Sequence, residues 1–149
     1  MRILAVSQGD AQNRSLPRWA TSMSETSMVP APVEFQLLRR VQGLVDYLYQ
    51  IVDQELVTPR VARLAWEAWS ALSNSVGNAL LVPDVCPGPD GELLYTWDQG
   101  EHYLELEIFP AAPAELFYEN DATGAVWESI FSIGEMVPAE VLEKLRLFV

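Results

Sequence analysis

The chain has 149 residues, about the size of one domain, and half of them are hydrophobic, which suffices for a core without disulfide support. Cys86 is the single cysteine, so an internal disulfide is excluded, and no apolar run approaches the roughly 20 residues that cross a bilayer. We therefore expect a cytoplasmic protein that neither spans nor binds a membrane.

The net charge of −12 is unevenly distributed along the chain. No Lys or Arg occurs between residues 64 and 143, and fifteen acidic residues fall in that stretch. A field of one sign repels nucleic acid and anionic membranes and attracts basic proteins. The charge predicts a basic protein partner and no direct nucleic-acid binding, with plain solubility as the alternative explanation.

Residues 1–32 are expected to form a flexible tail, because they are rich in Ser, Gln and Pro and show neither helical nor strand periodicity. Met23 begins a second plausible translation start, which leaves open whether residues 1–22 belong to the native protein. We expect residues 33–149 to form a single domain.

The first predicted element is a helix over residues 33–56, where apolar side chains recur at steps of three and four. The stripe comprises Phe35, Leu38, Val41, Val45, Leu48 and Val52. It is widened by Leu37, Leu44 and Ile51. A stripe of that width predicts contacts on two sides, with a sheet and with a second helix.

A second helix is predicted from Pro59 to about residue 76–80. Thr58 is a favoured N-cap, and proline is favoured at the first helical position, where its missing N–H costs nothing. The apolar side of this helix comprises Val61, Ala65, Ala68 or Trp69, Leu72 and Val76. Because the link between the helices is short, residues 33–81 should form an antiparallel helical hairpin.

Residues 82–91 are expected to be a linker with a tight Asp90-Gly91 turn, because three prolines disfavour helix and interior strand alike. The hydrophobic period then changes to two, which predicts four strands at 92–97, 102–109, 115–119 and 125–131. Short polar, Pro or Gly links favour an antiparallel meander over residues 92–131. A last helix is predicted over residues 138–147.

This order of elements predicts an α+β fold, in which the helical hairpin packs on a four-stranded antiparallel sheet and a short helix ends the chain. In the most regular strand, Leu104, Leu106 and Ile108 face the hairpin, while Glu105 and Glu107 face the other side. That outer side is expected to carry also some of Glu115, Glu119 and Glu128.

Few side chains are candidates for catalysis or metal binding. His102 is the sole histidine, so two His ligands cannot come from one chain, and we expect it to be a surface imidazole beside an acidic turn. Glu105 and Glu107 could form a cation-binding or acid–base pair, but such sites need further ligands or cationic groups. Cys86 has no basic neighbour to activate its thiol. We predict no catalytic residue, no metal site and no cofactor.

The predicted partner-binding residues combine carboxylates with an aromatic anchor. The carboxylates are Glu105, Glu107, Glu119 and Asp121. Trp66 and Trp69 lie three residues apart on the second helix, of which only one side can face the sheet. A tryptophan left outside would be a natural interface anchor, with core packing of both as the alternative explanation.

One segment carries a family resemblance. Residues 83–97 contain a proline-rich lead, an Asp90-Gly91 turn and a strand ending in Trp97, and residues 103–108 alternate Leu and Glu. This pattern resembles a group of small uncharacterised bacterial proteins that tend to be encoded beside another short gene, in arrangements resembling toxin–antitoxin pairs. The resemblance implies a two-protein system and transfers no catalytic residue.

The leading hypothesis is a non-catalytic acidic module that docks on a basic protein, as an antitoxin- or immunity-type inhibitor of a toxin or nuclease, or as an accessory subunit. Nucleases need basic surfaces to hold phosphates, so an inhibitor that covers one should be acidic. Three alternatives stay open: a nucleic-acid mimic that blocks a DNA-binding protein, a structural subunit or homodimer formed through the wide first-helix stripe, and an enzyme that uses Glu105 and Glu107.

Overall fold

The computed structural model describes residues 33–111 and 113–149, with side chains from residue 38 onward. The predicted tail, residues 1–32, lies outside the described residues, as do the side chains of Phe35 and Leu37. Within the described part of the chain, no helix is long and apolar enough to cross a bilayer.

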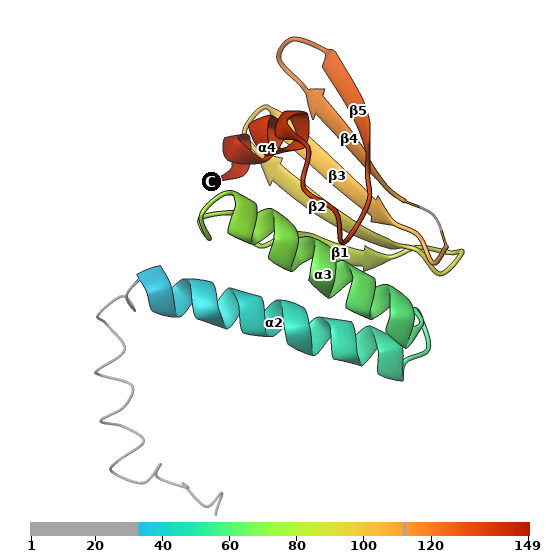
Figure 1. Cartoon of the computed structure of the whole chain (residues 1–149). Helices are drawn as coiled ribbons and strands as arrows, with labels where there is room; N and C mark the ends of the chain where they lie inside the picture. Colours follow the sequence, from blue (N-terminus) through green and yellow to red (C-terminus); the bar gives the residue numbers. More distant parts are fainter. Residues whose placement is uncertain (1–32, 112) are drawn as a thin grey trace, which may run out of the picture. The chain divides into compact units, whose positions relative to one another are not determined.

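The described residues have an α+β fold in which helices pack on an antiparallel sheet (Figure 1). Two long helices come first, α2 (Val33–Asp53) and α3 (Pro59–Ser75). The strands are β1 (Asp84–Pro87), β2 (Leu93–Gln99), β3 (His102–Ile108), β4 (Ala114–Asn120) and β5 (Ala125–Phe131). They lie in chain order, so the predicted antiparallel meander is confirmed. The last elements are α4 (Ala139–Leu145) and the 3₁₀ turn η2 (Arg146–Phe148).

The sheet has five strands instead of the predicted four, because residues 84–87 of the expected linker pair with β2. In this pairing Pro87 lies opposite Leu93. Proline is excluded from interior strands but fits an edge strand, where one side of the backbone has no partner strand. The turn that follows holds Gly91 at a φ of 85°, a conformation that favours glycine.

Local hydrogen bonds and backbone conformation set the start of α3 and the ends of α2 and α3. The hydroxyl oxygen of Thr58 accepts a hydrogen bond from the Val61 N–H at 3.3 Å, and Pro59 lies in the first turn, so the predicted start of α3 is confirmed. After α2 and α3 the chain passes through positive φ, at Glu55 (57°) and Gly77 (80°). This left-handed conformation lets the following backbone N–H groups reach the last carbonyls of each helix.

The core lies between the sheet and helices α3 and α4. The Tyr95 hydroxyl of β2 donates a hydrogen bond to the Ala65 carbonyl of α3 at 2.8 Å, and the Trp97 indole N–H donates to the Leu81 carbonyl at 2.6 Å. The buried inner face of the sheet comprises Leu93, Tyr95, Trp97, Leu104, Leu106, Ile108, Ala114, Leu116, Tyr118 and Phe131. On the opposite, outer face every strand position is half-buried or exposed.

Helix α2 buries a narrower stripe than the sequence predicted. Leu44, Leu48 and Ile51 are buried, and they follow one line of the helix at steps of four and three. Leu38, placed in the predicted stripe, is 65% exposed, and Val45 is half-buried. Periodicity alone could not show which edge of the wide stripe contacts the rest of the fold, so a row of apolar side chains is left facing solvent.

Candidate protein-binding surface

The outer face of the sheet gathers glutamates from alternate positions of β3, β4 and β5. The antiparallel register sets Glu107 directly opposite Glu115, and Glu105 opposite Phe117. Phe117 in turn lies opposite Glu128 of β5. The acidic face is defined here as Glu105, Glu107, Glu115, Glu119 and Glu128.

Apolar side chains lie among these carboxylates. Phe117 is half-buried, while Val126 and Ile130 are 57% and 64% exposed. A shallow groove of about 360 Å³ is lined by the carboxylates of Glu105, Glu107, Glu115 and Glu128 and by Phe117 and Ile130. The face therefore offers negative charge and apolar area together, which is typical of a surface that a partner covers.

The crowding of carboxylates is clearest at Glu107, whose pKa is raised above the ordinary glutamate value. Partial burial is the largest cause, and the negative charges of Glu92, Glu105 and Glu115 add to it. Beside them, the Tyr103 hydroxyl donates a hydrogen bond to Glu105 at 2.7 Å. Burial, that bond and the nearby carboxylates raise the pKa of Tyr103 to about 12. In both shifts burial acts first, and the nearby negative charges act in the same direction.

The cations of the described residues do not neutralise the acidic face. Lys144 of α4 lies 4.5 Å from the ring centroid of Tyr118, on the inner side of the sheet. Among the described residues one ion pair occurs, between Arg63 and Glu67 of α3, with an N–O distance of 4.0 Å. Both partners are largely exposed, so the pair contributes little stability. The glutamates of the outer face thus have no Lys or Arg partner in the described part of the chain.

Comparisons of the chain with protein-family models, curated proteins and solved structures find no match. Within the described residues, no group of three or more His, Cys, Asp or Glu side chains is placed to hold a metal ion. The two surfaces with distinctive chemistry are the acidic face and an apolar groove between α2 and α3.

Three of the four acidic residues proposed from the sequence lie on the acidic face, and the fourth lies in a turn next to it. Glu119 lies opposite Tyr103 on the outer face, as expected. Asp121 lies in the exposed turn after β4, at the rim of the face. Glu115 and Glu128, which the sequence left undecided, belong to the face. Only the strand register reveals them, because it decides which side chains of neighbouring strands are opposed.

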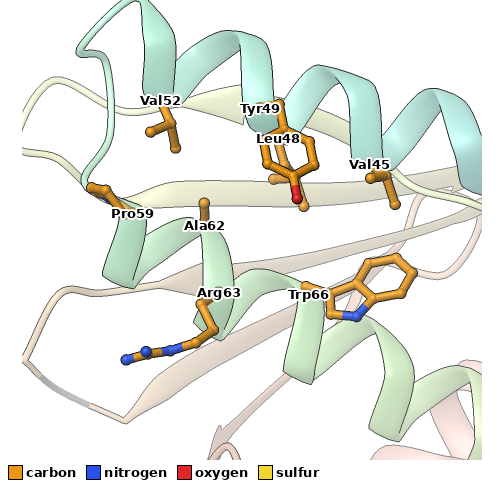
Figure 2. A pocket seen from close by; sticks show the side chains of 8 residues that line it. All are labelled: Val45, Leu48, Tyr49, Val52, Pro59, Ala62, Arg63 and Trp66. Carbon is orange, nitrogen blue, oxygen red and sulfur yellow. The ribbon is translucent and has the colours of Figure 1, made fainter.

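The two tryptophans of α3 lie in different environments. Trp69 is 3% exposed and belongs to the core, so it is not available to a partner, whereas Trp66 is 37% exposed. Trp66 lines the α2–α3 groove, which has a volume of about 420 Å³ (Figure 2). Each helix contributes four side chains to it: Val45, Leu48, Tyr49 and Val52 from α2, and Pro59, Ala62, Arg63 and Trp66 from α3.

Trp66 does not extend the acidic face. Helix α3 packs on the inner face of the sheet, as the bond between Tyr95 and Ala65 shows, so the sheet separates Trp66 from the outer glutamates. The sequence had grouped these residues as parts of one interface. The structure instead distributes them over two surfaces, one acidic and one apolar.

His102 is not the surface imidazole that the sequence predicted. It is half-buried on the inner side, where its Nδ1 atom lies 2.8 Å from the Tyr118 hydroxyl and its ring stacks with Tyr118 at a centroid distance of 6.0 Å. The edge of Phe148 completes this aromatic cluster. Strand alternation turns His102 toward the core and away from the acidic turn. Cys86 is exposed on β1, and its thiol contacts the Pro87 carbonyl at 3.5 Å.

The Glu107→Gln substitution is expected to stabilise the protein at neutral pH. Because the pKa of Glu107 is raised in the folded state, the fold loses stability as the pH rises through that pKa, and Gln removes this loss. We expect a gain of about 0.2–1 kcal/mol in the free energy of unfolding, the size of cross-strand pair effects. Urea unfolding should show the gain at pH 7 and lose it well below the ordinary glutamate pKa, where Glu107 is protonated in both states. Equal stability of the two proteins at pH 7 would contradict this account.

Proposed function

We propose that the chain is a non-catalytic, cytoplasmic protein-binding module that docks its acidic face on a basic surface of a partner protein. The role that fits this best is an antitoxin- or immunity-type inhibitor, which covers the nucleic-acid-binding surface of a toxin or nuclease. The observation that carries the proposal is the acidic face itself, with five glutamates on one sheet surface and no Lys or Arg partner among the described residues.

The charge of the face supplies attraction and orientation. A nuclease holds phosphates with Lys and Arg, so its binding surface is the kind of basic surface that clustered glutamates complement. Complementary fields accelerate association and disfavour wrong partners. Burial and the neighbouring carboxylates of Glu92, Glu105 and Glu115 together raise the pKa of Glu107, and a partner's cations would relieve the electrostatic part of that cost.

The apolar side chains of the face favour a protein partner over simple imitation of DNA. A nucleic-acid mimic needs carboxylates spaced like phosphates along a surface, whereas Phe117, Val126 and Ile130 interrupt the glutamates here. In a protein interface such side chains would be desolvated and would exclude water from the ion pairs. The resemblance expected from residues 83–97 and 103–108, to proteins of toxin–antitoxin-like gene pairs, would imply the same kind of partner.

The proposal is tested by affinity capture from a lysate of the encoding organism, with the whole chain immobilised. Three proteins are compared: the wild type, a face variant carrying Glu105→Gln, Glu107→Gln and Glu115→Gln, and a control carrying Glu135→Gln, Glu140→Gln and Glu143→Gln. The control residues are exposed and lie off the acidic face. Each variant neutralises three carboxylates, so both lose the same charge. Circular dichroism confirms that each variant is folded.

We expect a basic protein to be retained by the wild type and the control and to be lost with the face variant. Equal loss from both variants would mean that net charge alone attracts the partner, and the acidic face would then not be the site. Recovery of no basic protein at low and at moderate salt would overturn the proposal. Competition by added DNA should release the captured protein if its basic surface is a nucleic-acid-binding surface.

A further inference from the structure

We infer that the α2–α3 groove is the interface between two copies of this chain. The inference is independent of the proposed function, because the groove lies on the helices and the acidic face on the other side of the sheet. It rests on three features of the described residues: an apolar hollow with projecting aromatic side chains, the distribution of charge over the chain, and the order of charges along α2.

Across a two-fold axis, the groove of each copy can receive the projecting aromatic side chains of the other copy. Tyr49 is 74% exposed, a high value for an aromatic side chain, and lines the groove together with Trp66 (Figure 2). The groove also exposes parts of Val45, Val52 and Ala62. A symmetric dimer needs one patch that carries both the projection and the hollow. Here both occur on the same pair of helices.

The charge distribution favours the helical surface over the sheet for contact between two copies of the chain. Residues 33–76, which contain α2 and α3, carry four arginines and five acidic residues, a net charge of −1. Residues 77–149, which contain the sheet and α4, carry two basic and fourteen acidic residues, a net charge of −12. Two copies that met through their sheets would bring like charges together, whereas the helical surface imposes no such cost.

The charges of α2 also match those of a second α2 that runs in the opposite direction. Arg39 lies exposed toward the start of the helix, and the exposed Asp53 ends it. Antiparallel apposition places Arg39 of each copy beside Asp53 of the other. Near the midpoint, Asp46 already accepts a hydrogen bond from Gln42 at 2.8 Å. Such a dimer would present two acidic faces, directed outward, to two basic partners.

The test is the mass of the whole chain in solution, measured by sedimentation from about 1 µM to about 200 µM. We expect a dimer of about 33 kDa, twice the chain mass of 16.7 kDa. Tyr49→Glu should weaken dimerisation at least about 100-fold, since it buries a charge in the apolar interface. The matched control is Ile130→Glu, which places the same charge on an exposed apolar position of the sheet and should leave the dimer intact.

A charge exchange tests the direction of the helices and separates the interface from folding defects. The Arg39→Glu variant and the Asp53→Arg variant should each be monomeric, because like charges then meet twice. Mixed together, they should form a heterodimer of wild-type mass. A wild-type chain that stays monomeric throughout the concentration range would overturn the inference, as would a dimer insensitive to Tyr49→Glu, and so would two variants that fail to associate on mixing. None of these outcomes bears on binding of a basic partner to the acidic face.

Discussion

Association of the chain with its captured basic partner is expected to slow at least about tenfold as the ionic strength rises from about 0.01 M to about 0.15 M. Over that range the Debye length falls from about 30 Å to about 8 Å, so attraction that acts before contact is screened. Electrostatic steering of this kind raises association rates by about 10- to 1000-fold. Stopped-flow fluorescence of the tryptophans measures the rate directly.

The face variant separates steering by the acidic face from steering by the whole molecule. Removal of the charges of Glu105, Glu107 and Glu115 should lower the association rate at low salt and reduce the slope of its salt dependence. The control variant, with the same net charge, should keep most of the wild-type slope, because charges near the contact dominate steering. A salt dependence that is the same for the two variants would show that the position of the charges is irrelevant.

The Tyr95→Ala substitution is expected to be the most damaging single change to the fold, at about 3–5 kcal/mol, as for other buried aromatic residues. Tyr95 is fully buried, its ring meets that of Trp97 edge-on at 6.1 Å, and its hydroxyl bonds to the Ala65 carbonyl at 2.8 Å. Truncation leaves a cavity where α3 meets the sheet. Urea unfolding followed by circular dichroism gives the free energy.

Two companion variants show whether Tyr95 acts through its ring or its hydroxyl. Tyr95→Phe keeps the ring and loses the bond to Ala65, which should cost about 1 kcal/mol. Met136→Ala, at a side chain that is 91% exposed, should stay within about 0.5 kcal/mol of the wild type. If Tyr95→Ala cost no more than Met136→Ala, the packing of α3 on the sheet described above would be wrong.

The sequence predicted those elements that depend only on residues close together in the chain. Thr58 and Pro59 define the start of α3 by their own chemistry, and the strict alternation of Leu104, Glu105 and Leu106 leaves no choice of face for β3. The prolines around β1 led to the wrong prediction of a linker there. The rule that excludes proline from strands applies to interior strands, and whether a strand lies at an edge depends on the whole sheet. Similarly, the wide stripe of α2 allowed several contact lines, and packing against the remaining fold selected Leu44, Leu48 and Ile51.

The acidic face was predictable only in part for the same reason. Alternation placed Glu105 and Glu107 on one side of their strand, but the opposition of Glu115 to Glu107 depends on the register between β3 and β4, which the pattern within one strand does not determine. The sequence also grouped Trp66 with these glutamates, since nothing local distinguishes the two sides of the sheet. His102 was misplaced because proximity in sequence to an acidic turn says less than strand alternation about where a side chain points.

The most direct test of the central claim is a nuclear magnetic resonance titration of the isotope-labelled chain with the captured basic protein. We expect signals of the outer face, including Phe117, Val126 and Ile130, to shift or broaden on binding. Signals of Tyr49 and Trp66 in the α2–α3 groove should remain unchanged by the partner. Changes confined to α2 and α3, with the outer face unaffected, would contradict the account.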